Sequence, residues 1–286
     1  MSFVAARECR WMVDGLTLEG LQWGDPDGRP VLALHGWLDN AASFSRLAPQ
    51  LSGCHVVALD LSGQGLSSRR SADATYQIWD DLPQLVAILD ALGWEQAALL
   101  GHSRGAIIST LLASAIPQRI THLILLDALI PLAVPEEAFA AQLGRFLCER
   151  QSAVAAVPRR YADYESAIAA RTRRGLPDAA ARLLAGRSLE GSNDVGWSWR
   201  SDLRLRGASA VKLSAAQIGS VLAAIDAPVL LMLAAGGMMQ GHDQVQLAMT
   251  QIKRMQTAQV EGSHHFHMEP VIDDWIASIM AFLEEY

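Results

Sequence analysis

Five short apolar runs recur along the chain, and each has too few polar residues for one face to meet water. They occupy residues 31–35, 54–60, 97–101, 121–127 and 228–233. Strands of a parallel sheet that helices cover on both faces have continuous apolar runs rather than a strict alternation. The pattern therefore predicts the strands of a mostly parallel sheet.

Longer segments with apolar residues at helical spacing lie between most of these runs. We expect helices over 77–92, over 104–116, where Pro117 stops the helix, and over 270–284. Strands that alternate with helices predict a doubly wound α/β sheet. Residues 8–23 precede this pattern and read as a β-hairpin closed by Asp14-Gly15, a dipeptide suited to a tight turn.

The alternation stops between the fourth and fifth apolar runs. The intervening residues contain Ala-rich helical stretches and no convincing strand, and they are too many for a connecting loop. The helical stretches are 136–150, 160–174, 178–186 and 214–224. We expect a helical cap, residues 131–225, inserted after the sixth strand of a core formed by residues 1–130 and 226–286.

Composition narrows the function classes. The net charge is −7 and no Lys/Arg-rich run occurs. The chain therefore has no basic segment that would bind a phosphate backbone, and nucleic acid is not expected as a partner. No apolar run approaches the ~18–20 residues that span a bilayer. The three cysteines, Cys9, Cys54 and Cys148, are scattered and odd in number, which argues against a disulfide framework. We expect a cytoplasmic protein; the pattern leaves its oligomeric state open.

The strongest local signal is Gly101-His102-Ser103-Arg104-Gly105, which follows an apolar run and precedes a predicted helix. This G-x-S-x-G pattern is typical of a nucleophile elbow, a turn so tight that the residues two before and two after the serine must be small. The elbow would expose the Ser103 hydroxyl at the carboxyl end of the sheet. The backbone N–H of Arg104, at the helix start, could then face a developing oxyanion.

A histidine-rich loop near the end of the chain is the natural source of a catalytic base. It reads Gly262-Ser263-His264-His265-Phe266-His267 and precedes the last predicted helix. A base that follows nucleophile and acid along the chain fits the order Ser…acid…His. No second Cys/His/Asp cluster with ligand spacing is present, so we expect no metal site.

Four blocks of the sequence resemble the α/β-hydrolase superfamily in order: HGWLDNAASF (35–44), DLSGQGLS (60–67), GHSRG (101–105) and GSHHFHMEP (262–270). The similarity covers nearly the whole chain, and GWSWRSDLRLRG (196–207) is most similar to the serine hydrolase-like branch. The resemblance implies that Trp37 supplies the second oxyanion N–H and that His264 is the base. It gives Asp60 a structural role in the turn after its strand.

The acid departs from the family pattern. The commonest position lies just after the run 228–233, where this chain has AAGGMM (234–239) and no carboxylate. Asp226 precedes that strand and so lies at the wrong end of the sheet, and Asp243 reads as a helix N-cap. Asp127 ends the strand that follows the nucleophile strand, a position some relatives use. We favour Asp127 and keep Asp243 as the alternative.

Together these residues predict a serine hydrolase that cleaves small-molecule carboxylic esters through an acyl-enzyme on Ser103, with no cofactor. Haloalkane dehalogenase and epoxide hydrolase chemistry would need an aspartate in place of Ser103. Thioesterase, amidase, perhydrolase and C–C bond hydrolase activities remain open because the same triad can serve them. The missing acid at the usual place also leaves open a ligand-binding receptor of hydrolase fold.

Overall fold

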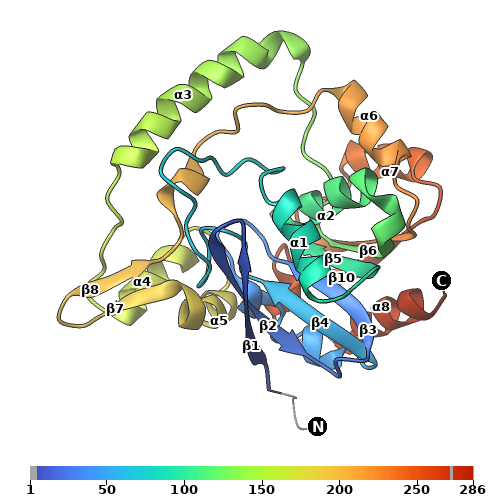
Figure 1. Cartoon of the computed structure of the whole chain (residues 1–286), viewed down its shortest axis with the longest axis horizontal. Helices are drawn as coiled ribbons and strands as arrows, with labels where there is room; N and C mark the ends of the chain where they lie inside the picture. The colour runs from blue at the N-terminus through green and yellow to red at the C-terminus, as the bar shows by residue number, and fades with distance from the viewer. Residues whose placement is uncertain (1–4, 271–272, 286) are drawn as a thin grey trace.

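A computed structural model describes residues 5–270 and 273–285. Within them the chain forms an eight-stranded sheet in the order β1-β2-β4-β3-β5-β6-β9-β10. The strands pair in parallel from β4 onwards, whereas β2 is antiparallel to both of its neighbours. The strands are β1 (Arg7–Val13), β2 (Leu16–Trp23), β3 (Arg29–Leu34), β4 (Cys54–Leu59), β5 (Ala97–His102), β6 (Ile120–Leu126), β9 (Val229–Gly236) and β10 (Met255–Ser263). The doubly wound, mostly parallel sheet that the apolar runs predict is confirmed (Figure 1).

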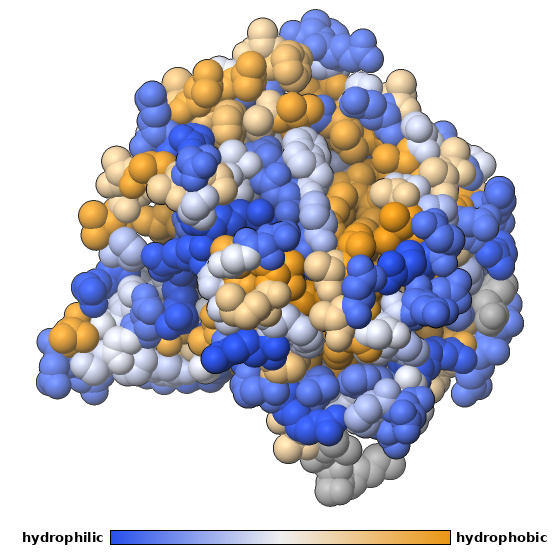
Figure 2. Space-filling model, in the orientation of Figure 1, coloured by the Kyte–Doolittle hydropathy of each residue, from blue (hydrophilic) through white to orange (hydrophobic). Residues whose placement is uncertain are grey.

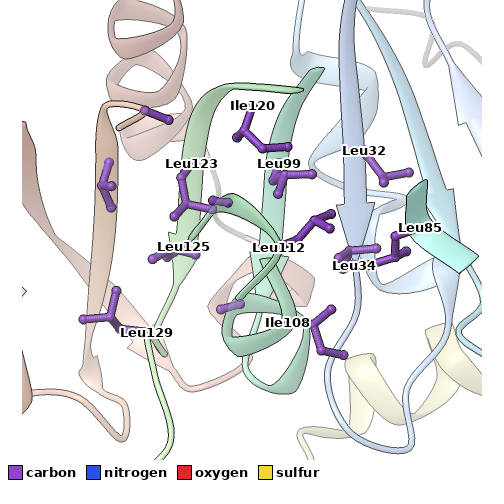
Figure 3. Close-up of a cluster of buried hydrophobic side chains, with 14 of the residues drawn as sticks. Leu32, Leu34, Leu85, Leu99, Ile108, Leu112, Ile120, Leu123, Leu125 and Leu129 are labelled. Atoms are coloured by element: carbon purple, nitrogen blue, oxygen red, sulfur yellow. The ribbon is translucent and has the colours of Figure 1, made fainter. Parts of the chain in front are cut away.

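Helices cover both faces of this sheet. One face packs on α1 (Leu82–Ala91), α2 (Arg104–Ala115), α6 (Ala215–Ala223) and α7 (Asp243–Gln251). The other face packs on the 3₁₀ helix η1 (Ala41–Phe44) and on α8 (Asp273–Glu285). Figure 3 shows the first of these cores, in which leucine and isoleucine side chains of β3, β5 and β6 interlock with those of α1 and α2.

The predicted N-terminal hairpin forms, and the first predicted helix starts later than the sequence suggests. Asp14 and Gly15 close the β1–β2 hairpin with φ values of 51° and 75°, as a tight turn requires. Helix α1 begins at Leu82 rather than near residue 77, because Pro83 lacks an N–H and fits the first helical turn. Residues 271 and 272, in the predicted helix 270–284, lie outside the described residues.

The segment between β6 and β9 is mainly helical but contains a hairpin. It comprises η4 (Glu136–Ala138), α3 (Phe139–Ala155), α4 (Tyr164–Thr172), α5 (Asp178–Ser188), β7 (Leu189–Ser192), β8 (Gly196–Trp199), η5 (Leu203–Arg206) and α6. The expectation of no strand here was wrong: β7 and β8 pair antiparallel around the turn residues Asn193 and Asp194. Alternating aromatic residues favour β8 as a strand. Helix α6 packs against α2 in the main core, and the domain boundaries at 131 and 225 stay predictions.

Helix α3 arches over the carboxyl end of the sheet (Figure 1), and none of its residues, all of which the structure describes, is buried. In the same orientation, hydrophobic surface gathers over this arch and in the centre-right of the molecule, with hydrophilic surface between the two (Figure 2). Helix α5, by contrast, is anchored to the core by Arg187. Its guanidinium pairs with buried Asp60 at 2.7 Å and with Glu8 at 2.7 Å. The described helices include none that is both long and apolar enough to cross a membrane.

Candidate active site

Ser103 occupies a strained turn between β5 and α2. Its φ and ψ are 50° and −117°, which places a non-glycine residue in the left-handed half of the map at a cost of order 1–3 kcal/mol. A Cβ on Gly101 would lie 2.5 Å from Ala106 Cα, and one on Gly105 would lie 2.0 Å from the Leu34 carbonyl oxygen. Both glycines are therefore required for α2 to approach the sheet this closely, which is the geometry that the G-x-S-x-G pattern predicts.

The start of α2 leaves a hydroxyl and an N–H group available. Ser103 precedes the helix, yet its hydroxyl does not cap it and has no hydrogen-bond partner among the described residues. The first N–H groups of a helix have no intrahelical acceptor, and Arg104 supplies the first of them. The Arg104 side chain extends elsewhere, donating to Asp81 at 3.0 Å. Its backbone N–H can therefore serve a developing negative charge beside Ser103.

The loop after β3 carries the second N–H group. Within the described part of the chain the backbone N–H of Trp37 makes no hydrogen bond, whereas the next N–H, of Leu38, donates to Gln64 Oε1 at 2.7 Å. Leu38 is held at a φ of 63°. The Trp37 indole donates to the Leu205 carbonyl at 2.8 Å and so ties this loop to η5. We refer to residues 35–39 as the oxyanion loop.

His35 fixes the base of the oxyanion loop. Its Nδ1–H donates to the Gly36 carbonyl at 2.7 Å, and its Nε2 accepts from the Leu61 N–H at 3.0 Å. Burial lowers the pKa of His35 to about 4, so the ring is neutral near pH 7 and can keep one donor and one acceptor. His35 thus links the ends of β3 and β4 and is not available as a base.

The structure brings Asp127 and His264 together. Asp127 Oδ2 lies 2.6 Å from His264 Nδ1, and this aspartate is fully buried at the end of β6 with a φ of 48°. The backbone N–H groups of Met238 and Ala234 also donate to its carboxylate, at 2.7 and 3.3 Å. A Cβ on residue 237 would lie 2.3 Å from Asp127 Oδ2, so Gly237 makes room for the carboxylate.

The alternative acids lie elsewhere. Asp243 is in the first turn of α7, where the N-cap is His242 rather than Asp243 as the sequence suggested, and the His242 ring accepts from Gln244 N–H. Asp226 is exposed and pairs with Lys253 at 3.3 Å. Neither carboxylate contacts His264 in the described structure, so among the three candidates Asp127 holds the position an acid needs.

The other two histidines of the late loop, His265 and His267, pack against neighbouring rings. His267 is fully buried, with its ring 4.1 Å from that of His102 and 5.7 Å from that of Phe44. Burial holds its pKa well below the usual value, and the pKa of His265 is lowered to about 4, again chiefly by burial. His102 Nε2 hydrogen-bonds to the His264 carbonyl at 2.9 Å and so positions the loop against β5. No cluster suited to a metal ion occurs among the described residues.

Asp60 accepts three hydrogen bonds in the buried turn after β4. Its oxygens accept the N–H groups of Ala41 and Leu66 at 2.7 and 2.8 Å, besides the Arg187 guanidinium. A Cβ on Gly65 would overlap the Asp60 carboxylate. The turn therefore depends on Asp60 and Gly65, in agreement with a structural role.

The oxyanion loop contacts α4 through residues that carry no signal of this contact in the sequence. The Arg171 guanidinium donates to the Leu38 carbonyl at 3.0 Å and pairs with Asp39 at 3.3 Å. Burial raises the pKa of Asp39 to about 6, an effect that the nearby Arg171 charge opposes. Asp39 stands in the first of the four blocks that resemble the family, residues 35–44, but nothing in the pattern of α4 singles out Arg171 from the other arginines there.

Comparisons with known proteins agree with this geometry. The family model described as the α/β hydrolase fold matches residues 29–270. A serine hydrolase-like protein of Dictyostelium discoideum is 30% identical over 89% of this chain and 75% of its own length, and one of Danio rerio is 29% identical over 92% and 84%. The crystal structure of a hypothetical protein of Pseudomonas aeruginosa PAO1 is 37% identical, with a TM-score of 0.89 over 97% of this chain and 99% of that one. The chain therefore belongs to the α/β-hydrolase fold family, in its serine hydrolase-like branch.

Proposed function

We propose that this hydrolase cleaves small-molecule carboxylic esters through an acyl-enzyme on Ser103. The contact between Asp127 and His264 Nδ1 is the observation that carries the proposal. When Nδ1–H donates to the carboxylate, the lone pair of the imidazole is on Nε2, the nitrogen that must accept a proton from the nucleophile. A buried acid, a base of the required tautomer and a strained serine then follow the carboxyl ends of β6, β10 and β5.

In the proposed reaction, His264 takes the Ser103 hydroxyl proton as the oxygen attacks the ester carbonyl. The N–H groups of Trp37 and Arg104 stabilise the oxyanion of the tetrahedral intermediate, each contributing roughly 3 kcal/mol by analogy with measured oxyanion holes. The imidazolium returns its proton to the alkoxide leaving group, which departs as the alcohol. Water then repeats the sequence on the acyl-enzyme and releases the carboxylic acid.

The comparisons support a serine nucleophile without naming its substrate. Curated relatives carry the name serine hydrolase-like. A thioesterase domain of the curacin biosynthetic pathway has the same fold, with a TM-score of 0.81 at 23% identity. A thioester carbonyl would meet the same nucleophile, base and oxyanion donors, so thioesters belong in any test.

The test is a panel of 4-nitrophenyl esters from acetate to palmitate, assayed with the wild type and with Ser103→Ala. We expect turnover of at least one chain length by the wild type. Ser103→Ala should keep the fold and lose nearly all activity, retaining only what binding and the oxyanion donors supply. Equal turnover by the two proteins would overturn the proposal. Covalent inertness of wild-type Ser103 would favour a ligand receptor of this fold instead.

A further inference from the structure

A second site lies in the segment between β6 and β9. A cavity of about 300 Å³ opens between the end of α3, the turn after α4, the end of β8 and η5. Three arginines line it, Arg159, Arg174 and Arg206, and the aromatic rings of Tyr161 and Trp199 form part of its wall. The backbone of Tyr161 bonds in both directions to Trp197 of β8 at 2.8 Å, which holds the wall to the hairpin.

None of these three arginines has a carboxylate partner within the described residues. Arg159 lies over the Tyr161 ring at 5.1 Å, and the guanidinium groups of Arg174 and Arg206 form no ion pair with any residue that the structure describes. Other arginines of the same segment do pair: Arg182 with two carboxylates and Arg200 with one. The cavity therefore gathers three solvent-exposed positive charges that have no carboxylate partner among the described residues.

The arginines also repel one another. Partial burial lowers the pKa of Arg206, and the positive charges of Arg174 and Arg171 lower it further. An anion in the cavity would relieve this repulsion, and guanidinium groups suit carboxylate and phosphate because their planar fork can form two parallel hydrogen bonds.

Side chains connect the cavity with the oxyanion loop. The Arg171 guanidinium contacts Asp39 and lies over the Trp199 ring at 5.0 Å, and Trp199 lines the cavity. On a second route, the Trp37 indole donates to the carbonyl of Leu205, the residue before Arg206. Two sets of side-chain contacts thus join the wall of the cavity to the oxyanion loop, one through Trp199 and one through the backbone beside Arg206.

We propose that Arg159, Arg174 and Arg206 bind an anionic group, a carboxylate or a phosphate, at the end of the substrate remote from the bond that Ser103 attacks. The inference rests on the proposed acyl-enzyme chemistry and adds a substrate class to it: acyl donors that carry a negative charge. The binding of the anion itself does not depend on that chemistry, and the two can be measured separately.

The first experiment compares matched charged and neutral substrates. For the carboxylate source the pair is mono-4-nitrophenyl adipate and 4-nitrophenyl hexanoate; for the phosphate source it is butyryl-coenzyme A and butyryl-N-acetylcysteamine. The variants are Arg206→Gln and Arg174→Gln. The control is Arg173→Gln, which removes the same charge from an exposed neighbour that does not line the cavity.

We expect the wild type to prefer the charged member of one pair, and that pair identifies the source of the anion. Arg206→Gln and Arg174→Gln should lower kcat/KM for this charged substrate at least tenfold more than for its neutral match, mainly through KM. Arg173→Gln should leave the preference unchanged. Equal wild-type kcat/KM within both pairs, or equal effects of the cavity and control variants, would overturn the inference.

Calorimetry on Ser103→Ala protein separates this inference from the proposed function. We expect adipate or coenzyme A to bind and the affinity to fall at least tenfold when Arg206→Gln is added, but not with Arg173→Gln. Anion binding without hydrolysis of any ester or thioester would uphold the site and defeat the proposed function. Hydrolysis without anion binding would do the reverse.

Discussion

Gly237→Ala should disable the site without changing any ionisable group. A Cβ at residue 237 would lie 2.3 and 2.4 Å from the two carboxylate oxygens of Asp127, where ordinary contact begins near 3.4 Å. The carboxylate or the loop must therefore move by about 1 Å. The carboxylate is buried and held by Met238 N–H, so it has little room to move without lengthening its 2.6 Å contact with His264 Nδ1.

Loss of the acid from a triad lowers kcat by ~10⁴-fold, and a displaced carboxylate should retain part of its electrostatic effect. We expect kcat to fall by ~10²–10⁴-fold, or roughly 2.7–5.5 kcal/mol of transition-state stabilisation. The assay is steady-state hydrolysis of the best 4-nitrophenyl ester. Gly144→Ala in α3, where a Cβ would meet nothing within 4 Å, is the matched control and should keep full activity.

A double-mutant cycle tests the reason for the loss. If Gly237→Ala acts through Asp127, then adding it to Asp127→Asn should cost little more, because the acid is already gone. A folded Gly237→Ala protein with kcat within threefold of the wild type would refute the argument. Fully additive losses would also contradict it.

Three further predictions concern the base, the anchor of α5 and pH. His264→Ala should lower kcat of ester hydrolysis by at least ~10³-fold and His265→Ala by less than tenfold; the reverse order would show that the base is misassigned. Arg187→Met leaves the buried Asp60 carboxylate without its cation, so urea unfolding should show a loss of about 3–5 kcal/mol, and unchanged stability would count against this anchor. His35 has a folded-state pKa of about 4, below its unfolded value of 6.5, so its stabilising contribution is present above pH 6.5 and is lost as the pH falls towards 4. Between pH 7 and pH 5, protonation of His35 should lower the free energy of unfolding by about 2 kcal/mol. His35→Asn should reduce the measured pH dependence of the unfolding free energy by that amount.

The sheet and the elbow could be predicted from sequence because they depend on local constraints. Buried parallel strands need continuous apolar runs, and the turn at Ser103 needs glycine at 101 and 105, whatever the rest of the chain does. Asp127 could be proposed because its strand ends at the same edge of the sheet as the nucleophile strand, although no pattern places it beside His264.

The parts that sequence reasoning missed depend on tertiary contacts. The β7–β8 hairpin lies among Ala-rich helices, and its short strands give only a weak period-two signal. Strand β10 was not predicted because its edge position leaves many of its side chains exposed and polar. The pairing of Arg171 with Asp39 joins residues far apart in the chain, and no local spacing specifies it.

Covalent labelling of Ser103 tests the central proposal most directly. Purified protein is treated with a fluorophosphonate, digested, and the peptide containing residues 101–105 is analysed by mass spectrometry. We predict stoichiometric modification of Ser103 within minutes, none in Ser103→Ala, and a rate at least ~10²-fold lower in His264→Ala because the base is missing. An unmodified Ser103 in the wild type, or equal labelling rates with and without His264, would contradict the proposal that this serine is an activated nucleophile.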